Sequence, residues 1–146
     1  MSRYISELTQ NKVRVRAKFL CEYCHGSEQW QYVPFTVDHV IPLSKGGAND
    51  INNFALACFH CNRQKSDKVT AFDQESDTEV PLFNPRSDAW QDHFIWSKDM
   101  LTIVGITPKG RATVLTLNLN RKRIITIRAA DLEIGRHPPD NDPIQS

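Results

Sequence analysis

Four cysteines in two Cys-x-x-Cys pairs carry the clearest chemical pattern in this sequence. Cys21 and Cys24 form the first pair, Cys58 and Cys61 form the second, and the chain has no other cysteine. Two such pairs supply the four thiolates that structural zinc prefers, each sulfur about 2.3 Å from the ion. Two disulfides are the alternative, but a Cys-x-x-Cys pair closed on itself restrains little of a chain. We therefore predict a structural zinc site.

Between the two pairs, an acidic residue is followed directly by a histidine. Asp38 and His39 lie in an aromatic and β-branched stretch, residues 30–41, which predicts a strand interrupted at Pro34. Neighbouring strand residues point to opposite faces unless the backbone bends. A bend would let the carboxylate hold a hard divalent cation while the imidazole, a common general base, faces a water. An isolated Asp-His pair is more often structural, and it is the enclosing cysteine pairs that favour the chemical interpretation.

The elements that must position these residues are short. A helix over residues 10–20 runs into Cys21, a turn-rich loop covers residues 44–50, and a helix covers residues 62–66. Further on we expect a long surface loop at 67–89, strands at 90–96 and 100–106, and helices at 108–118 and 121–133. Thr107 and Pro108 are typical of a helix start, although the Thr and Ile content of these last segments partly favours strand.

Composition and charge limit the classes of protein. The chain has 146 residues, 40% of them hydrophobic and 24% charged, as in ordinary globular proteins. No apolar run approaches the roughly 18 residues of a membrane helix, and the N-terminus lacks an apolar signal core, so we expect a cytoplasmic protein. The formal net charge is only +1. Basic residues dominate 1–20 and 109–128 and acids dominate 66–99, which fits either one cationic face or a merely uneven surface.

Several motifs in order resemble the His-Asn-His (HNH) endonucleases, the ββα-metal (His-Me finger) nucleases with paired zinc knuckles. The segments that carry the resemblance are Cys21–Cys24, Asp38-His39-Val40-Ile41-Pro42-Leu43-Ser44-Lys45-Gly46-Gly47, Asn53–Cys58 and Cys61-Asn62-Arg63-Gln64-Lys65. The resemblance implies an α+β fold with a ββα-metal core stapled by four cysteines and a C-terminal strand and helix extension. We divide the chain into a nuclease core (1–66), a surface loop (67–89), an extension packed on the core (90–139) and a tail (140–146).

The resemblance also implies a role for each matching residue. His39 takes the place of the general base, and Asp38 and Asn62 take the places of the ligands to a catalytic Mg²⁺ or Mn²⁺. Asn53, the middle letter of the signature, braces the loop behind the catalytic histidine. Arg63 and Lys65, with Arg14 and Lys18 of the basic N-terminal helix, are candidate contacts to DNA phosphates. The pattern gives no fixed role to His25 or His60.

The sequence thus favours a divalent-metal-dependent DNA endonuclease, with a structural zinc ion and no membrane association. A zinc-knuckle DNA-binding module without catalysis is the main alternative, but binding alone needs neither a base nor an acid beside a phosphate. A zinc-stabilised protein-interaction domain is a third possibility, because the net charge is modest. Protein partners and oligomeric state are left open.

Overall fold

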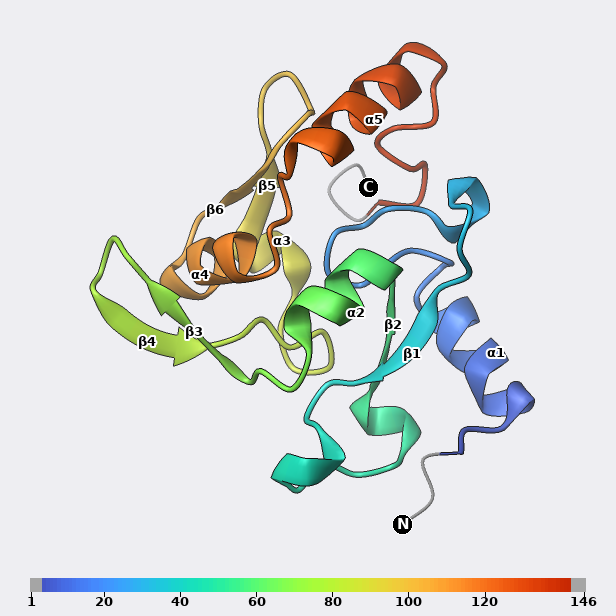
Figure 1. Cartoon of the computed structure of the whole chain (residues 1–146). Coiled ribbons are helices and arrows are strands. Elements are labelled where there is room, and N and C mark those ends of the chain that lie inside the picture. Colours follow the sequence, from blue (N-terminus) through green and yellow to red (C-terminus); the bar gives the residue numbers. More distant parts are fainter. Residues whose placement is uncertain (1–3, 143–146) are drawn as a thin grey trace.

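Short helices and three separate antiparallel strand pairs make up the structure, a computed structural model that describes residues 4–142 (Figure 1). The helices are α1 (Glu7–Arg16), α2 (Phe59–Lys65), α3 (Trp90–His93), α4 (Pro108–Thr116) and α5 (Lys122–Glu133). The strands are β1 (Thr36–His39), β2 (Phe54–Ala57), β3 (Thr70–Asp73), β4 (Thr78–Pro81), β5 (Phe94–Trp96) and β6 (Ile103–Gly105). Three 3₁₀ turns cover Glu28–Trp30, Leu43–Lys45 and Ile51–Asn53.

The ββα unit consists of β1, β2 and α2. β1 pairs with β2 so that Asp38 lies opposite Ala55 and His39 opposite Phe54, and α2 begins two residues after β2 ends. α1 and α2 lie on opposite sides of this pair in Figure 1. β2 is buried along its whole length because both of its faces are covered. The expected α+β fold with a ββα core is confirmed.

Helix ends differ from the sequence expectation for local reasons. α1 begins at Glu7 rather than residue 10, because the Ser6 hydroxyl accepts a hydrogen bond from Thr9 N at 3.1 Å and caps the helix. It ends at Arg16, since Lys18 and Phe19 have positive φ values of 57° and 61°. The helix expected at 62–66 begins earlier, at Phe59, and its N-cap is Cys58.

The expected surface loop at 67–89 is wrong, because its middle is the β3–β4 hairpin. β3 alternates exposed and buried residues, but one of the buried positions is Asp73, whose carboxylate is paired with Arg111 of α4. The strand expected at 30–41 is shortened to β1, and a helical turn, α3, takes the first part of the strand expected at 90–96. The helix start at Thr107 and the two following helices are confirmed.

One main core joins the ββα unit to the later elements. Val13 of α1 and Leu56 of β2 share this core with Phe94 of β5 and Leu117 at the end of α4. The Trp90 indole also donates to Tyr23 O at 2.9 Å, beneath the first cysteine pair. Among the described residues, no helix is long and apolar enough to cross a membrane.

Candidate active site and metal centre

The two cysteine pairs come together at one end of the ββα unit. The sulfurs of Cys21, Cys24, Cys58 and Cys61 all lie within 4.8 Å of one another, and all four are free thiols. Cys24 Sγ and Cys58 Sγ are 3.8 Å apart, which equals the edge of about 3.8 Å of a tetrahedron with 2.3 Å zinc–sulfur bonds. A disulfide would need about 2.05 Å. The donor set therefore fits a four-thiolate metal site.

Local backbone turns build each half of this metal site. In the first half, His25 N donates to Cys21 O at 2.8 Å and Gly26 N reaches Cys24 Sγ at 3.5 Å. In the second half, Cys58 Sγ accepts from Cys61 N at 3.4 Å as the α2 cap. Hydrogen bonds from the other thiols, Cys21 first, lower the pKa of Cys24 well below its usual value. Burial raises the pKa of Cys21 well above its usual value, and the hydrogen bond with Cys21 does the same for Cys61. Among these sulfurs, Cys24 is therefore the one that most readily becomes a thiolate.

Asp38 is held by one of its two carboxylate oxygens. Its Oδ2 accepts a hydrogen bond from the Tyr23 hydroxyl at 2.9 Å and lies 3.1 Å from Lys65 Nζ. No hydrogen bond to its Oδ1 occurs within residues 4–142, and this oxygen is not a buried atom. Burial raises the pKa of the Asp38 carboxyl, and the Lys65 charge opposes that shift. Sequence reasoning missed Tyr23, although it stands between two ligand cysteines.

His39 is fixed by contacts on two sides of its ring. Its Nε2 lies 2.7 Å from Asn49 Oδ1, and its ring meets Phe54 edge-to-face at 5.1 Å between centroids. Because an amide oxygen only accepts, this contact requires a proton on Nε2 and leaves the Nδ1 lone pair free. Asn49 was not predicted as a site residue, and it lies in the loop expected at 44–50.

Asn53 braces the backbone that follows His39. Its Nδ2 donates to Ile41 O at 2.9 Å and to Ala48 O at 2.8 Å, and its Oδ1 accepts from Ile41 N at 2.9 Å. Gly47 permits this closed loop, because a Cβ there would stand 1.7 Å from Ile41 O. With its side chain used in this way, Asn53 is placed to hold the loop rather than to touch a substrate.

Asp38, His39 and Asn62 line one cavity of about 320 Å³ between β1 and α2. Asn62 occupies the second turn of α2 rather than its first residue, and no hydrogen bond of its side chain occurs within residues 4–142. Ser66 and Asp67 also line this cavity, and neither was predicted. A carboxylate, an amide and an imidazole therefore face one space, an arrangement able to bind a hard cation and accept a proton.

Comparison with known families agrees with this geometry. Residues 21–68 match the HNH endonuclease family. The match spans both cysteine pairs and the whole ββα unit, and it supports a nuclease-type function and nucleic-acid binding for this HNH segment. Neither the curated proteins nor the solved structures contain a significant match to the chain.

Two of the four basic residues expected to contact DNA are engaged inside the protein. Lys65 of the HNH segment is only 1% exposed, and its ammonium contacts Asp38 and His39 O, so the expected phosphate contact is wrong for this residue. Arg14 binds Glu28 and donates to Phe35 O at 2.8 Å, which also occupies its guanidinium.

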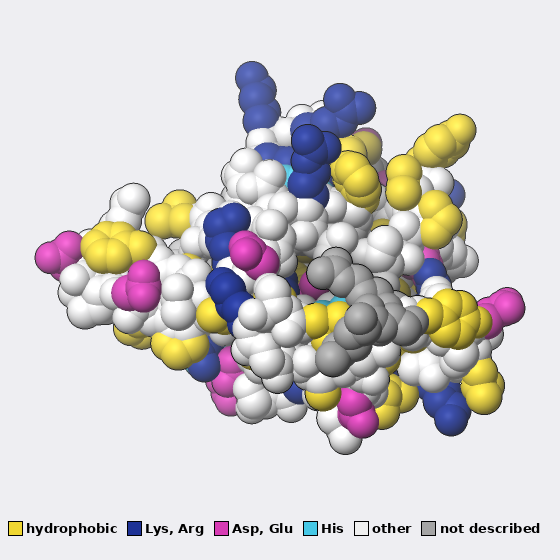
Figure 2. All heavy atoms as spheres, turned by 60° about the horizontal axis from the view of Figure 1, so that its bottom comes forward, with side chains coloured by type: hydrophobic (Ala, Val, Ile, Leu, Met, Phe, Trp, Pro, Cys, Tyr) yellow, Lys and Arg dark blue, Asp and Glu magenta, His cyan; other side chains and the backbone are white. Residues whose placement is uncertain are grey.

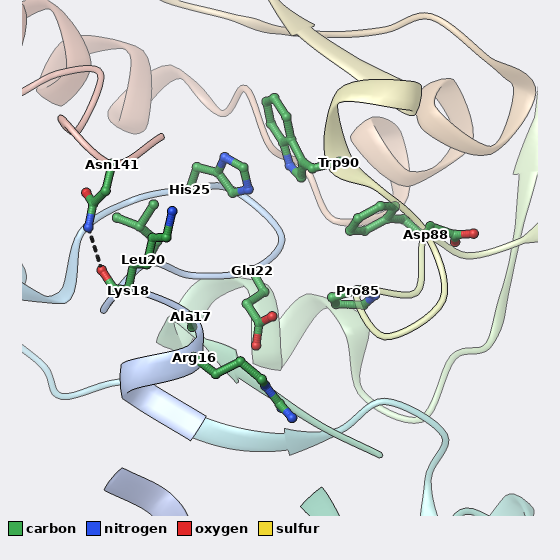
Figure 3. Close-up of a pocket in the computed structure, with 11 residues that line it drawn as sticks. Arg16, Ala17, Lys18, Leu20, Glu22, His25, Pro85, Asp88, Trp90 and Asn141 are labelled. Carbon is green, nitrogen blue, oxygen red and sulfur yellow. Dashed lines mark hydrogen bonds between the residues drawn. The ribbon is translucent and has the colours of Figure 1, made fainter. Parts of the chain in front are cut away.

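The other two basic residues are exposed. Arg63 lies on α2 next to Asn62, with its guanidinium 5.9 Å from the Phe59 ring centroid. Lys18 lies away from the HNH cavity, beside a separate pocket of about 170 Å³ lined also by Glu22, His25 and Trp90 (Figure 3). There Asn141 donates to Lys18 O at 3.0 Å.

Charges on the surface are mixed. On the face shown in Figure 2, several Lys and Arg side chains gather at the upper edge, and others are scattered with acidic side chains over the rest. This view does not show the single cationic face that was one of the two expectations for the basic segments.

Proposed function

We propose that this protein is a divalent-metal-dependent DNA endonuclease that hydrolyses phosphodiester bonds with His39 as general base. The observation that carries the proposal is the shared cavity, in which Asp38, His39 and Asn62 stand together inside the matched HNH segment. A structural zinc ion held by the four cysteines is part of the proposal, because their sulfur positions fit a tetrahedral site.

His39 would act through Nδ1, the ring nitrogen that the contact with Asn49 leaves unprotonated. Nδ1 accepts a proton from a water molecule as the water oxygen attacks the phosphorus atom. The bond from phosphorus to the 3′ oxygen then breaks and the leaving oxygen takes a proton from a solvent water, which yields a 5′-phosphate and a 3′-hydroxyl. Asn53 supports this step by holding the backbone at Ile41 and Ala48.

Asp38 and Asn62 would hold the catalytic cation through Asp38 Oδ1 and the Asn62 amide oxygen. Both are hard oxygen ligands, the kind that Mg²⁺ and Mn²⁺ bind. When bound, such an ion stabilises negative charge on the phosphate and on the leaving oxygen. Two protein ligands leave most of the coordination shell to water, which suits magnesium. Arg63, exposed beside Asn62, is our candidate for contact with the DNA backbone.

Cleavage of supercoiled plasmid tests this function directly. Wild type, His39→Ala and Asn62→Ala are compared in Mg²⁺, in Mn²⁺ and in excess chelator, at equal zinc content and equal unfolding temperature. Asn52→Ala is the matched control, since Asn52 is exposed and does not line the cavity. We expect metal-dependent nicking or linearisation by wild type and by the control. We expect His39→Ala to lower the cleavage rate by a factor on the order of 10² or more, because it removes the general base.

The opposite result would identify a different class of protein. If wild type cut no duplex, single-stranded or branched DNA while wild type and His39→Ala bound DNA equally, the non-catalytic zinc module would be the better description. Binding that falls steeply with salt would then separate a DNA-binding module from a protein-interaction domain.

A further inference from the structure

Tyr23 and Lys65 meet at the carboxylate that we assign to the catalytic cation. We propose that they are positioning residues, which hold Asp38 Oδ2 so that Oδ1 alone faces the cavity and which thereby couple the cysteine knuckle to cation binding. This inference rests on the proposed function, because it concerns how well Asp38 serves as a metal ligand. Neither Tyr23 nor Lys65 takes part in a step of the proposed hydrolysis.

Burial shows that these contacts are obligatory. Tyr23 is fully buried, Lys65 is 1% exposed and Asp38 is 7% exposed. An ammonium or a carboxylate removed from water is stable only when it is paired and hydrogen-bonded. The Tyr23 hydroxyl donates its proton to Asp38 Oδ2, and the Lys65 ammonium lies beside the same oxygen. The three groups therefore satisfy one another and restrain the Asp38 side chain.

Both donors bind the same oxygen. The Tyr23 hydroxyl donates to Oδ2 at 2.9 Å, and the closest approach of Lys65 Nζ to the carboxylate is to the same oxygen, at 3.1 Å. Lys65 Nζ also donates to His39 O at 3.2 Å. One ammonium thus fixes the Asp38 side chain and the His39 backbone together. A cation that reaches the carboxylate from the cavity finds a single free oxygen, already oriented.

The two positioning residues are tied to the two halves of the metal centre. Tyr23 lies between Cys21 and Cys24, and Lys65 lies four residues after Cys61 on α2, one helical turn along the same face. Each cysteine pair therefore sends one donor to Asp38. A shift in the knuckle would move these donors, so the four-cysteine site sets the geometry of the cation site as well as the fold.

Tyr23→Phe is the informative substitution, because it removes only the hydroxyl and keeps the buried ring that packs edge-on against Phe83. Loss of a group that orients a metal ligand typically weakens metal binding by about 10- to 100-fold. The matched control is Tyr32→Phe, the same chemical change at a fully exposed position. Asp38→Asn removes the proposed ligand, so any Mn²⁺ binding that it retains occurs at other places on the protein.

The experiment is a Mn²⁺ titration of the zinc-loaded protein of residues 1–146, read by paramagnetic broadening of amide NMR signals. In wild type and Tyr32→Phe, we expect signals from residues 38–40 and around Asn62 to broaden with the same midpoint, and Asp38→Asn to abolish this local effect. Tyr23→Phe should keep the unperturbed spectrum of a folded, zinc-loaded protein, while its midpoint moves to roughly 10-fold or more higher Mn²⁺.

The outcomes separate the inference from the function on which it rests. If wild type showed no Asp38-dependent broadening, the proposed cation site itself would be overturned and the inference would go with it. If wild type bound Mn²⁺ through Asp38 and Tyr23→Phe had the same midpoint, only the positioning role would be overturned. A Tyr23→Phe protein that released its zinc would show that Tyr23 serves the knuckle alone, which also contradicts the proposal.

Discussion

Lys65 is a residue whose role is decided by burial rather than by charge. In the sequence it follows Arg63 by two positions and has the character of a phosphate contact, yet in the structure its ammonium lies inside the protein, 3.1 Å from Asp38. A buried carboxylate that loses its cation is left as an uncompensated charge, which is far more costly than losing a surface ion pair. The pair is therefore a structural requirement of the site.

Replacing Lys65 by Met should destabilise the protein by about 3–5 kcal/mol, because Asp38 would remain buried without a cation. The free energy of unfolding, measured by denaturant titration of the zinc-loaded protein, tests this expectation. The double variant Lys65→Met with Asp38→Asn removes both charges and should regain a large part of the loss. A Lys65→Met protein as stable as wild type would show that the ion pair contributes nothing to the fold.

Arg63, by contrast with Lys65, is exposed to solvent. It is two residues before Lys65 on α2 and stays exposed, so only one of these two basic residues presents its charge to solvent. Helical periodicity explains the split, since positions two apart on a helix face different directions. The sequence Cys-x-x-Cys-Asn-x-x-Lys predicts which of the two side chains is buried only once the helix is known to begin at Phe59.

At the scale of elements, those marked by short sequence motifs were predicted correctly, and those that depend on tertiary contacts were missed. The ββα unit, the four-cysteine cluster and the helix start at Thr107 all rest on motifs a few residues long. The β3–β4 hairpin was missed because its strand pattern includes the buried Asp73, which has the character of a surface residue until Arg111 is known to pair with it. Tyr23 and Asn49 were not predicted as partners of Asp38 and His39, because each contact joins residues ten or more positions apart in the chain.

Cys58 joins three elements, so removing its thiol should have effects beyond the metal. It follows β2, caps α2 and lies 3.8 Å from the sulfur of Cys24. We expect wild type to contain one zinc per chain by elemental analysis, and Cys58→Ser to contain far less. Structural zinc contributes folding energy outright, so amide hydrogen exchange in β1, β2 and α2 should become much faster.

A comparison within the same molecule serves as the control for this variant. The β3–β4 hairpin is held to α4 by Asp73 and Arg111, away from the cysteines, and its amides should lose protection later than those of α2. Full zinc content and unchanged exchange in Cys58→Ser would refute the assignment of Cys58 as a ligand. Loss of zinc without faster exchange would show that the ion is not structural.

At the scale of the whole molecule, the HNH segment depends on elements that its own motif does not include. Trp90 stacks on His25 with ring centroids 4.0 Å apart, and His60 of α2 contacts Leu117 O at 2.9 Å. The two histidines to which the signature gave no role thus join the HNH segment to the C-terminal part of the chain. Such contacts are invisible in a sequence motif, because they depend on which surfaces the later elements cover.

We therefore expect residues 90–139 to unfold together with the HNH segment, as an extension packed on the core. Leu117 lies at the end of α4, is 0% exposed and belongs to the core that also contains Leu56 and Cys61. Leu117→Ala should cost about 2–5 kcal/mol and should lower the temperatures of unfolding and of zinc release together, in one transition. Leu115→Ala is the matched control, because that side chain is 58% exposed and its loss should change stability little.

Calorimetry distinguishes the two possible outcomes. Two separate unfolding transitions, of which Leu117→Ala shifts only the transition that releases no zinc, would mean that the extension is an independent domain. A single shifted transition would mean that the HNH segment needs the rest of the chain to hold its shape.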